Sequence, residues 1–319
     1  MNTDQSIPET ETVAGDRLQG VFAAALTPID ADLAPDFGRA TLHCRWLLRQ
    51  GCDGLAILGT TGEANSFSAG ERMDLLDHLV GNGVPAAVLL PGTGCAALSD
   101  TVALTAHACK LGVGGCLVLP PFYYKGVSEE GLFASYSEVI ERVGDARLRV
   151  YLYHFPQMTG LFLSIPLIER LSDRYPQTVV GVKDSSADLA NMLSVATALP
   201  EFAVFSGSDE LLLPLLEGGG AGCITACCNA AAPLAAAVYA AWRNGDRENA
   251  VAVQATLSEV RRIVSAYPLS AALKALFASS AGREGWARVR PPLVALDTDA
   301  RDALAEALAA VPFATAPWP

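Results

Sequence analysis

The octapeptide Val179-Val180-Gly181-Val182-Lys183-Asp184-Ser185-Ser186 is an apolar, β-branched run that passes directly into polar residues. A short run of this kind is typical of a buried parallel strand, and the polar residues mark the carboxyl end of that strand. Seven further apolar runs predict seven more strands, at Gly20–Leu26, Gly54–Leu58, Ala86–Leu90, Gly115–Leu119, Arg149–Tyr153, Phe202–Phe205 and Gly222–Thr225.

Helix-length amphipathic segments separate these runs, as expected of crossover helices between parallel strands. The clearest are Pro35–Gln50, Ala69–Gly81, Ser99–Leu111 and Glu129–Val143. Eight such units within about 210 residues favour a (β/α)8 barrel over a doubly wound sheet, which usually has about five or six strands. Neither GxGxxG nor GxxxxGK(S/T) occurs to offer a nucleotide-binding alternative. The predicted fold class is therefore α/β, with a TIM barrel.

The pattern changes after Thr225, where the sequence becomes Ala-rich and helical with no further strand. Four helical segments are predicted there, at Ala230–Trp242, Asp246–Ser265, Leu269–Ser280 and Asp297–Ala310. We therefore expect a flexible leader over 1–17, the barrel over 18–228 and a C-terminal helical bundle over 229–319.

The chain has 319 residues, of which 51% are hydrophobic and 18% charged, and its formal net charge is −12. No basic block occurs, which argues against a nucleic-acid surface and against an anchor on anionic membranes. Apolar stretches stay well below the about 18–20 residues of a membrane span, and residues 1–17 lack the apolar region of a secretory signal. We expect no nucleic-acid partner, no membrane association and a cytoplasmic location.

Eight cysteines lie mostly within apolar stretches and form no CxxC pair. We expect them to be reduced, buried thiols that pack as small hydrophobic residues. No cluster of His, Cys, Asp or Glu has the spacing of a metal site, and no GxSxG suggests a serine nucleophile. The sequence predicts neither a metal nor any other cofactor.

Lys183 is the most informative candidate, because the chain has only four lysines against eighteen arginines. Working groups of a (β/α)8 barrel follow the carboxyl ends of strands, and burial there favours the neutral amine that attacks carbonyl groups. Arginine cannot form the imine, so a lysine at this place favours covalent chemistry. The alternative is a structural lysine paired with Asp184 or Asp209 at the rim.

Two other strand ends carry suitable polar groups. Tyr153 ends the strand before that of Lys183, and its phenol suits proton transfer to and from a substrate oxygen. Gly59-Thr60-Thr61-Gly62-Glu63 forms a turn whose exposed N–H groups suit a carboxylate or a phosphate. A tyrosine at a strand end is more often a packed aromatic residue with its hydroxyl in water.

The four histidines favour structural roles. His154 follows Tyr153 and is expected on the opposite face of its strand, because side chains alternate along a strand. His43, His78 and His107 lie within predicted helices.

Taken together, these motifs resemble the dihydrodipicolinate synthase / N-acetylneuraminate lyase family over about residues 18–310. The stretches that carry the resemblance are 59–63 (GTTGE), 121–124 (PFYY), 153–160 (YHFPQMTG), 181–186 (GVKDSS), 206–210 (SGSDE) and 222–225 (GCIT). The resemblance implies a barrel with a C-terminal helical bundle, usually a tetramer, and class I aldolase chemistry on pyruvate or another 2-oxo acid.

Carried over residue by residue, the resemblance implies that Lys183 forms the Schiff base and Tyr153 shuttles protons. Thr60 and Thr61 match the turn that holds the substrate carboxylate, with Thr61 also in the proton relay. The tyrosine that reaches a neighbouring subunit's site is either Tyr123 or Tyr124, because the loop can be aligned with the family in two ways that differ by one residue. The remaining matches are Gly207 and Ile224, which line the pyruvate pocket.

Substrate choice is where the chain departs from the pattern of true dihydrodipicolinate synthases. Their Tyr-Asn-Val-Pro-x-Arg-Thr-Gly motif holds aspartate semialdehyde through its arginine, and Met158 stands at that position here, with His154 in place of the asparagine. Loss of a charge-assisted donor would weaken binding of that aldehyde by roughly 2 kcal/mol or more. Asp209 and Glu210 resemble the pair that grips substrate hydroxyls in sialic acid lyases, although an acidic first turn of a helix explains them equally well.

The sequence therefore predicts a lyase that uses a lysine Schiff base on pyruvate and hydroxylated 2-oxo acids. The reaction is aldol cleavage or condensation, or dehydration, of a 2-keto-3-deoxy sugar acid. One alternative is dihydrodipicolinate synthase itself, which condenses pyruvate with aspartate semialdehyde. A second alternative is a barrel that binds a 2-oxo acid without catalysis. We expect a small-molecule substrate and a homo-oligomer, either a tetramer or a dimer.

Overall fold

Seven parallel strands form the centre of the computed structural model, which describes residues 17–279 and 283–313. They are hydrogen-bonded in the order β2-β1-β7-β6-β5-β4-β3. Their bounds are β1 Gly20–Ala24, β2 Gly54–Ala56, β3 Cys116–Val118, β4 Val150–His154, β5 Val179–Asp184, β6 Ala203–Ser206 and β7 Gly222–Thr225. Nearly all of the leader predicted over 1–17 lies outside the described residues.

One predicted strand, Ala86–Leu90, is wrong as a regular strand. Ala86–Val88 is a short 3-10 helix, and single parallel bridges join Leu89 to β2 and Gly92 to β3. Pro91 has no N–H to donate, which limits the ladder that this run can form. The backbone still closes the barrel, because Leu90 N–H donates to Leu55 at 2.8 Å and Thr93 N–H donates to Leu117 at 3.0 Å.

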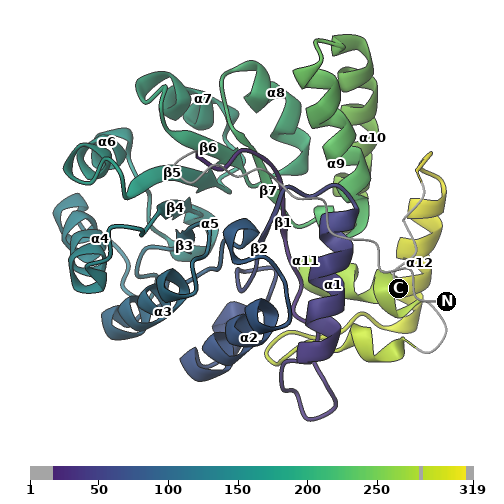
Figure 1. Ribbon diagram of the computed structural model, residues 1–319. Coiled ribbons are helices and arrows are strands. Elements are labelled where there is room, and N and C mark those ends of the chain that lie inside the picture. The colour runs from purple at the N-terminus through teal and green to yellow at the C-terminus, as the bar shows by residue number, and fades with distance from the viewer. Residues whose placement is uncertain (1–16, 280–282, 314–319) are drawn as a thin grey trace.

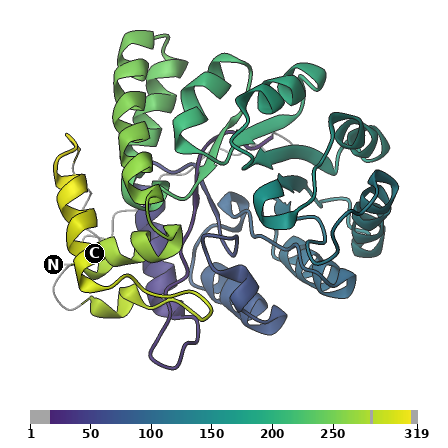
Figure 2. The same cartoon turned by 180° about the vertical axis from the view of Figure 1, so that it is seen from behind.

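Helices surround this barrel, and the last four gather on one side of it next to α1 (Figures 1 and 2). The helices around the strands are α1 Phe37–Arg49, α2 Ala69–Gly81, α3 Leu98–Lys110, α4 Glu129–Val143, α5 Pro156–Thr159, α6 Ile165–Arg174, α7 Leu189–Ala198 and α8 Leu212–Glu217. The C-terminal helices are α9 Cys228–Arg243, α10 Arg247–Ser265, α11 Leu269–Ala278 and α12 Thr298–Ala309. The architecture is the predicted TIM barrel with C-terminal helices. The exact domain boundary at 228 stays a prediction.

Side-chain caps explain where many of these helices begin. Ser68 forms a complete capping box with Glu71 at the start of α2. The Asp36 carboxylate caps α1 by accepting from Arg39 N–H, and Ser128 Oγ caps α4 by accepting from Gly131 N–H. Such caps satisfy N–H groups that have no partner within the helix, and each stabilises by about 1 kcal/mol. These signals explain why α2 and α4 begin at the residues that the sequence predicts.

Large apolar side chains fill the barrel interior, so the interior is a packed core. The inward cluster holds Phe22, Leu90, Leu117, Tyr151, Tyr153, Phe205 and Ile224, all at most 3% exposed. Gly181 of β5 makes room for the Tyr151 ring, because a Cβ there would lie 2.6 Å from that ring. Below this layer, the Tyr151 hydroxyl accepts from Leu18 N–H at 3.1 Å.

An aromatic cluster joins α1 to the C-terminal helices. The His43 ring lies 5.1 Å from that of Phe277 and 5.0 Å from that of Trp286, and it stacks on Trp46 with the ring centroids 5.8 Å apart. Its Nε2 lies 2.9 Å from Asn229 Oδ1. Burial lowers the pKa of His43 to about 4. The expected structural role of this histidine agrees with its surroundings.

We predict an acid-sensitive contribution from His43. Between pH 6.5 and about 4 the unfolded chain protonates this imidazole and the folded chain does not, so stability is lost as the pH falls through that window. His43→Phe removes the effect and keeps an aromatic ring. The free energy of unfolding of the native protein should fall relative to the variant by up to roughly 3 kcal/mol from pH 7.5 to pH 4. Chemical denaturation at both pH values measures it, and a constant difference would contradict the prediction.

No helix in the described ranges is both long and apolar enough to traverse a lipid bilayer.

Candidate active site

Lys183 and Tyr153 face each other across two neighbouring strands. They are paired in the register of β4 and β5, and both side chains turn into the barrel, where they are 5% and 3% exposed. Lys183 Nζ donates to the Tyr153 hydroxyl at 3.2 Å and lies 4.4 Å from the ring centroid. The sequence placed both at strand ends, and the fold brings them into contact.

Neither carboxylate suggested as a structural partner pairs with Lys183. Asp184 points to the other face of β5, where it accepts from Ser186 N–H and Asn191 Nδ2, each at 2.7 Å. Asp209 lies 3.7 Å from Arg261 instead. Among the described residues, Lys183 is a buried amine with a phenol as its hydrogen-bond partner and no ion pair.

A threonine hydroxyl extends this contact. Thr60 Oγ1 lies 3.4 Å from the Tyr153 hydroxyl, and either oxygen can donate. The resemblance implies that Thr61 takes part in the proton relay, but among the described residues the threonine hydroxyl that reaches Tyr153 is that of Thr60. Thr61 is nearly buried in the same turn, and its carbonyl accepts from Ser270 Oγ at 3.1 Å.

The turn at 59–63 has a strained shape that its surroundings hold in place. Glu63 adopts the left-handed region at φ 57°, which costs a non-glycine residue about 1 kcal/mol or more. Gly62 packs so closely that a Cβ would lie 2.9 Å from the Ala25 carbonyl, and Thr27 Oγ1 donates to the Gly62 carbonyl at 2.8 Å.

The backbone N–H groups of Thr60 and Thr61 have no acceptor among residues 17–279 and 283–313. Two such groups in one turn can bind an anion. This corner of the barrel therefore offers an amine, a phenol, a hydroxyl and two N–H groups that can bind a carboxylate, here called the carboxylate cradle.

Gly207 and Ile224 lie at the ends of the next two strands. Gly207 N–H donates to the Asp184 carbonyl at 2.7 Å, and a Cβ at Gly207 would lie 2.1 Å from Ser185 Oγ. Ile224 is fully buried in the inward cluster. Both lie in the part of the barrel that the resemblance implies, and their role as pocket lining stays a prediction.

The two acidic residues that follow β6 differ in exposure. Asp209 is fully buried outside the barrel, where it accepts from Thr225 Oγ1 at 2.6 Å, and burial raises its pKa to about 6. Its carboxylate faces α10 and does not join Lys183 and Tyr153. Glu210 is exposed at the rim. Of the expected pair, only Glu210 is open to solvent.

Three further candidates are exposed near the mouth of the barrel. Tyr123 and Tyr124 are 74% and 68% exposed, with ring centroids 5.5 Å apart, and Met158 of α5 is 60% exposed. None of them contacts Lys183 or Tyr153 within the described chain. Lys125 anchors their loop to α5 by donating to the Thr159 carbonyl at 2.7 Å.

His154 lies on the opposite face of β4 from Tyr153, as strand alternation predicts. Its Nδ1 accepts from Leu163 N–H at 3.2 Å, and its ring lies 4.6 Å from that of Phe162. Burial lowers the pKa of His154, while Asp184 and Asp188 oppose that shift. It is a packed histidine outside the barrel.

Sequence reasoning missed Arg72, a buried side chain of α2 that lines a narrow cavity together with Thr60 and Tyr153. Its guanidinium donates to the Gly92 carbonyl at 2.7 Å and to Cys95 Sγ at 3.0 Å. A lone arginine within a helix gives no signal of this contact, because the chain has many arginines.

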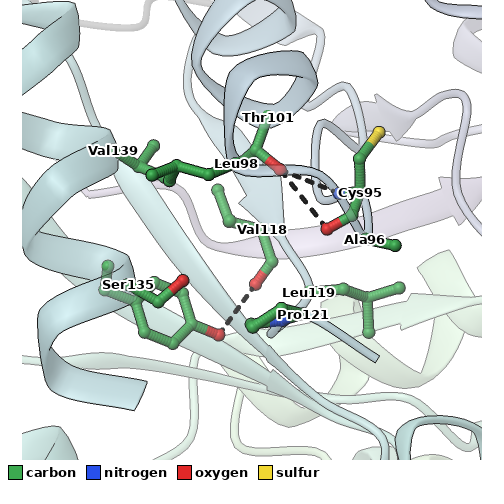
Figure 3. A pocket seen from close by; sticks show the side chains of 10 residues that line it. Cys95, Ala96, Leu98, Thr101, Val118, Leu119, Pro121, Ser135 and Val139 are labelled. Atoms are coloured by element: carbon green, nitrogen blue, oxygen red, sulfur yellow. Dashed lines mark hydrogen bonds between the residues drawn. The ribbon is translucent and has the colours of Figure 1, made fainter. Parts of the chain in front are cut away.

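A separate small cavity lies between α3 and α4 (Figure 3). Thr101 and Cys95 border one side of it, where Cys95 N–H donates to Thr101 Oγ1 at 3.0 Å, and Val118, Leu119 and Pro121 border another. Neither Lys183 nor Tyr153 lines it, so this cavity is separate from the candidate active site. All eight cysteines, Cys95 included, are free thiols.

No group of three or more His, Cys, Asp or Glu side chains in the described part of the chain is arranged to hold a metal ion.

Comparison with known proteins places this chain in a family. The model of the dihydrodipicolinate synthetase family matches residues 17–311. The chain belongs to this family. A DapA-like lyase of Chloroflexus aurantiacus is 37% identical over 300 residues, which cover 94% of this chain and 99% of the relative. A 4-hydroxy-tetrahydrodipicolinate synthase of Synechococcus is 33% identical over 298 residues, which cover 91% of this chain and 94% of the relative.

A solved family member has the same fold. It is a prophage protein of the dihydrodipicolinic acid synthase family from E. coli K12, in complex with pyruvate, and it is 29% identical with a TM-score of 0.84. The match covers 92% of this chain and 98% of that structure. Members of this family are Schiff-base lyases and aldolases, so the predicted enzyme class, a carbon–carbon lyase, is confirmed.

Proposed function

We propose that this lyase acts on pyruvate and hydroxylated 2-oxo acids through an imine at Lys183. The observation that carries the proposal is the buried Lys183 amine, which has a phenol 3.2 Å away and no carboxylate partner among the described residues. An amine held in this way is a nucleophile for a carbonyl carbon and needs no added cofactor. The relative solved with pyruvate supports the choice of first substrate.

In the proposed reaction, Lys183 Nζ attacks C2 of the 2-oxo acid and a C–N bond forms as the carbonyl oxygen takes up a proton. Tyr153 supplies that proton and exchanges it with Thr60, whose hydroxyl is within reach. Water then leaves, and a protonated imine remains on Lys183. When the C3–C4 bond breaks, the imine takes up the electron pair and becomes an enamine, while the C4 hydroxyl gives its proton to the Tyr153 oxygen and becomes an aldehyde; the reverse sequence forms that bond.

The substrate carboxylate is assigned to the turn after β2. The N–H groups of Thr60 and Thr61 have no acceptor in the described chain, and a carboxylate is the anion that a 2-oxo acid offers next to its carbonyl group. Fixing the carboxylate there orients C2 toward Lys183, which is the positioning that bond formation requires.

Hydroxylated substrates are favoured by two features of the rim. Met158 offers no charge to a second carboxylate, and the exposed Glu210 can accept hydrogen bonds from hydroxyl groups. We therefore propose a 2-keto-3-deoxy sugar acid, cleaved or dehydrated. Asp209, although it remains in the resemblance, is proposed as a support between β7 and α10 because its carboxylate is buried there.

A second candidate is condensation of pyruvate with aspartate semialdehyde. The full-length similarity to a 4-hydroxy-tetrahydrodipicolinate synthase favours it, and so does the Lys125 ammonium, which lies beside Thr159 next to Met158. A cation at this rim offers an alternative partner for the aldehyde's carboxylate.

Two assays separate the candidates. Purified protein is incubated with a panel of 2-keto-3-deoxy sugar acids, and both pyruvate release and dehydration are followed. A coupled assay with pyruvate and aspartate semialdehyde runs in parallel. We expect turnover in the first assay. Turnover in the second assay alone would mean that the enzyme is a dihydrodipicolinate synthase.

Replacing Met158 by arginine tests the substrate argument. Met158→Arg should raise kcat/KM for aspartate semialdehyde about 10-fold or more, because a charge-assisted hydrogen bond contributes about 1.5–3 kcal/mol. Met158→Leu is the matched control, since it keeps the size and adds no charge. High activity of the native enzyme on this aldehyde, unchanged in Met158→Arg, would contradict the argument.

We propose a homo-oligomer in which a second copy covers Tyr123 and Tyr124. The two rings are more than two-thirds exposed, and exposed neighbouring aromatic rings are typical of contact surfaces. The number of subunits, two or four, follows from light scattering.

A further inference from the structure

The turn that carries Thr60 and Thr61 is tied to the C-terminal helices by a buried ion pair. Lys274 of α11 and Glu63 are both fully buried, and Lys274 Nζ donates to Glu63 Oε1. The other carboxylate oxygen accepts from Arg290 N–H at 2.8 Å. More than two hundred residues of sequence separate Glu63 from both partners.

Stability alone gives a weak reason for this arrangement. A buried ion pair loses so much hydration that apolar side chains of similar size often stabilise a fold equally well. Lys274 is moreover the one charged residue of a helix that otherwise reads LSAALKALFA, and burial lowers its pKa against the opposing effect of Glu63. What the pair does provide is a fixed position for Glu63.

That position determines where the neighbouring N–H groups point. Glu63 ends the turn in its left-handed conformation, and its own N–H donates back to the Thr60 carbonyl at 3.1 Å. A second contact from α11 acts on the same turn, because Ser270 Oγ donates to the Thr61 carbonyl at 3.1 Å. Displacements of about 1 Å at a site of this kind cost about 100-fold in rate.

We propose that Lys274 is a positioning residue of the active site, which through Glu63 holds the Thr60-Thr61 turn in the orientation that binds the substrate carboxylate. The proposal rests on the proposed function, since it assumes a 2-oxo acid on Lys183. It gives the C-terminal helices a part in substrate binding that the barrel strands do not supply.

The test compares a ketone that has a carboxylate with one that lacks it. Borohydride traps the imine that Lys183 forms with pyruvate or with acetone, and the ratio of the two trapping rates reports on the carboxylate cradle. The variant combines Lys274→Met with Glu63→Gln, so no unpaired charge stays buried. We expect its pyruvate-to-acetone ratio to fall about 10-fold or more. A general loosening of the fold slows both reactions and leaves the ratio unchanged, which would overturn the proposal.

Glu217→Gln is the matched control. It breaks the ion pair in which Arg247 Nε of α10 lies 2.8 Å from Glu217 Oε1 of α8, and neither residue contacts the turn at 59–63 in the described chain. Its ratio should stay within twofold of the native value, and an equal fall would overturn the proposal. If the double variant does not fold, Ser270→Ala is tested in its place. Its pyruvate-to-acetone ratio should fall about threefold, and an unchanged ratio would contradict the proposal. A native enzyme that traps no pyruvate refutes the proposed function instead.

Discussion

Lys183→Met is expected to abolish turnover, lowering kcat by about 10⁴-fold or more, because the variant cannot form the imine. Tyr153 and the carboxylate cradle remain in the variant, so substrate binding should weaken far less than kcat falls. The folded state should be as stable as that of the native protein, since the substitution removes a buried amine that forms no ion pair within the described residues.

Lys110→Met is the matched control for this prediction. Lys110 is an exposed residue in the last turn of α3, and the same substitution there should leave activity unchanged. Steady-state kinetics with thermal unfolding of both variants measures the effect. Residual activity of Lys183→Met within tenfold of the native value would mean that no covalent intermediate on Lys183 is required.

Tyr153→Phe is expected to lower kcat by about 10²–10⁴-fold, the usual contribution of a positioned acid or base. The ring stays packed in the barrel, and only the hydroxyl that joins Lys183 Nζ to Thr60 Oγ1 is lost. The affinity for pyruvate should change little, because the carboxylate is bound by the turn. The loss should therefore appear in kcat with a nearly constant KM.

The control for Tyr153 lies two residues away on the same strand. Tyr151 also points into the barrel, but its hydroxyl accepts from Leu18 N–H at the opposite end of the interior. Tyr151→Phe should cost about 1 kcal/mol of stability and leave kcat unchanged. Equal losses in the two variants would assign the effect to the core and remove Tyr153 from the proton relay.

Strand ends are what the sequence predicts best for this protein. Lys183 and Tyr153 follow β-branched runs, and the parallel arrangement of those runs brings the two side chains into register. The C-terminal helices follow from the absence of further strands after Thr225. The run Ala86–Leu90 was not distinguishable from a strand, because short apolar runs next to proline carry the same pattern.

The sequence does not predict in which direction side chains in turns point. The choice between Thr60 and Thr61 depends on a turn with left-handed residues at Leu58 and Glu63, which no spacing rule encodes. Asp209 points outward because α10 brings Arg261 to it from fifty residues further along the chain. Lys274 carried a signal, a single charge in an apolar helix, but its partner Glu63 is visible only in the folded chain.

Mass spectrometry after borohydride reduction tests the central claim, an imine between Lys183 and a 2-oxo acid. The protein is incubated with pyruvate, reduced, and analysed both intact and as peptides. We predict one added pyruvyl group per chain, on the peptide that contains Lys183, and none in Lys183→Met. An unmodified Lys183 after reduction with pyruvate and with longer 2-oxo acids would contradict the account.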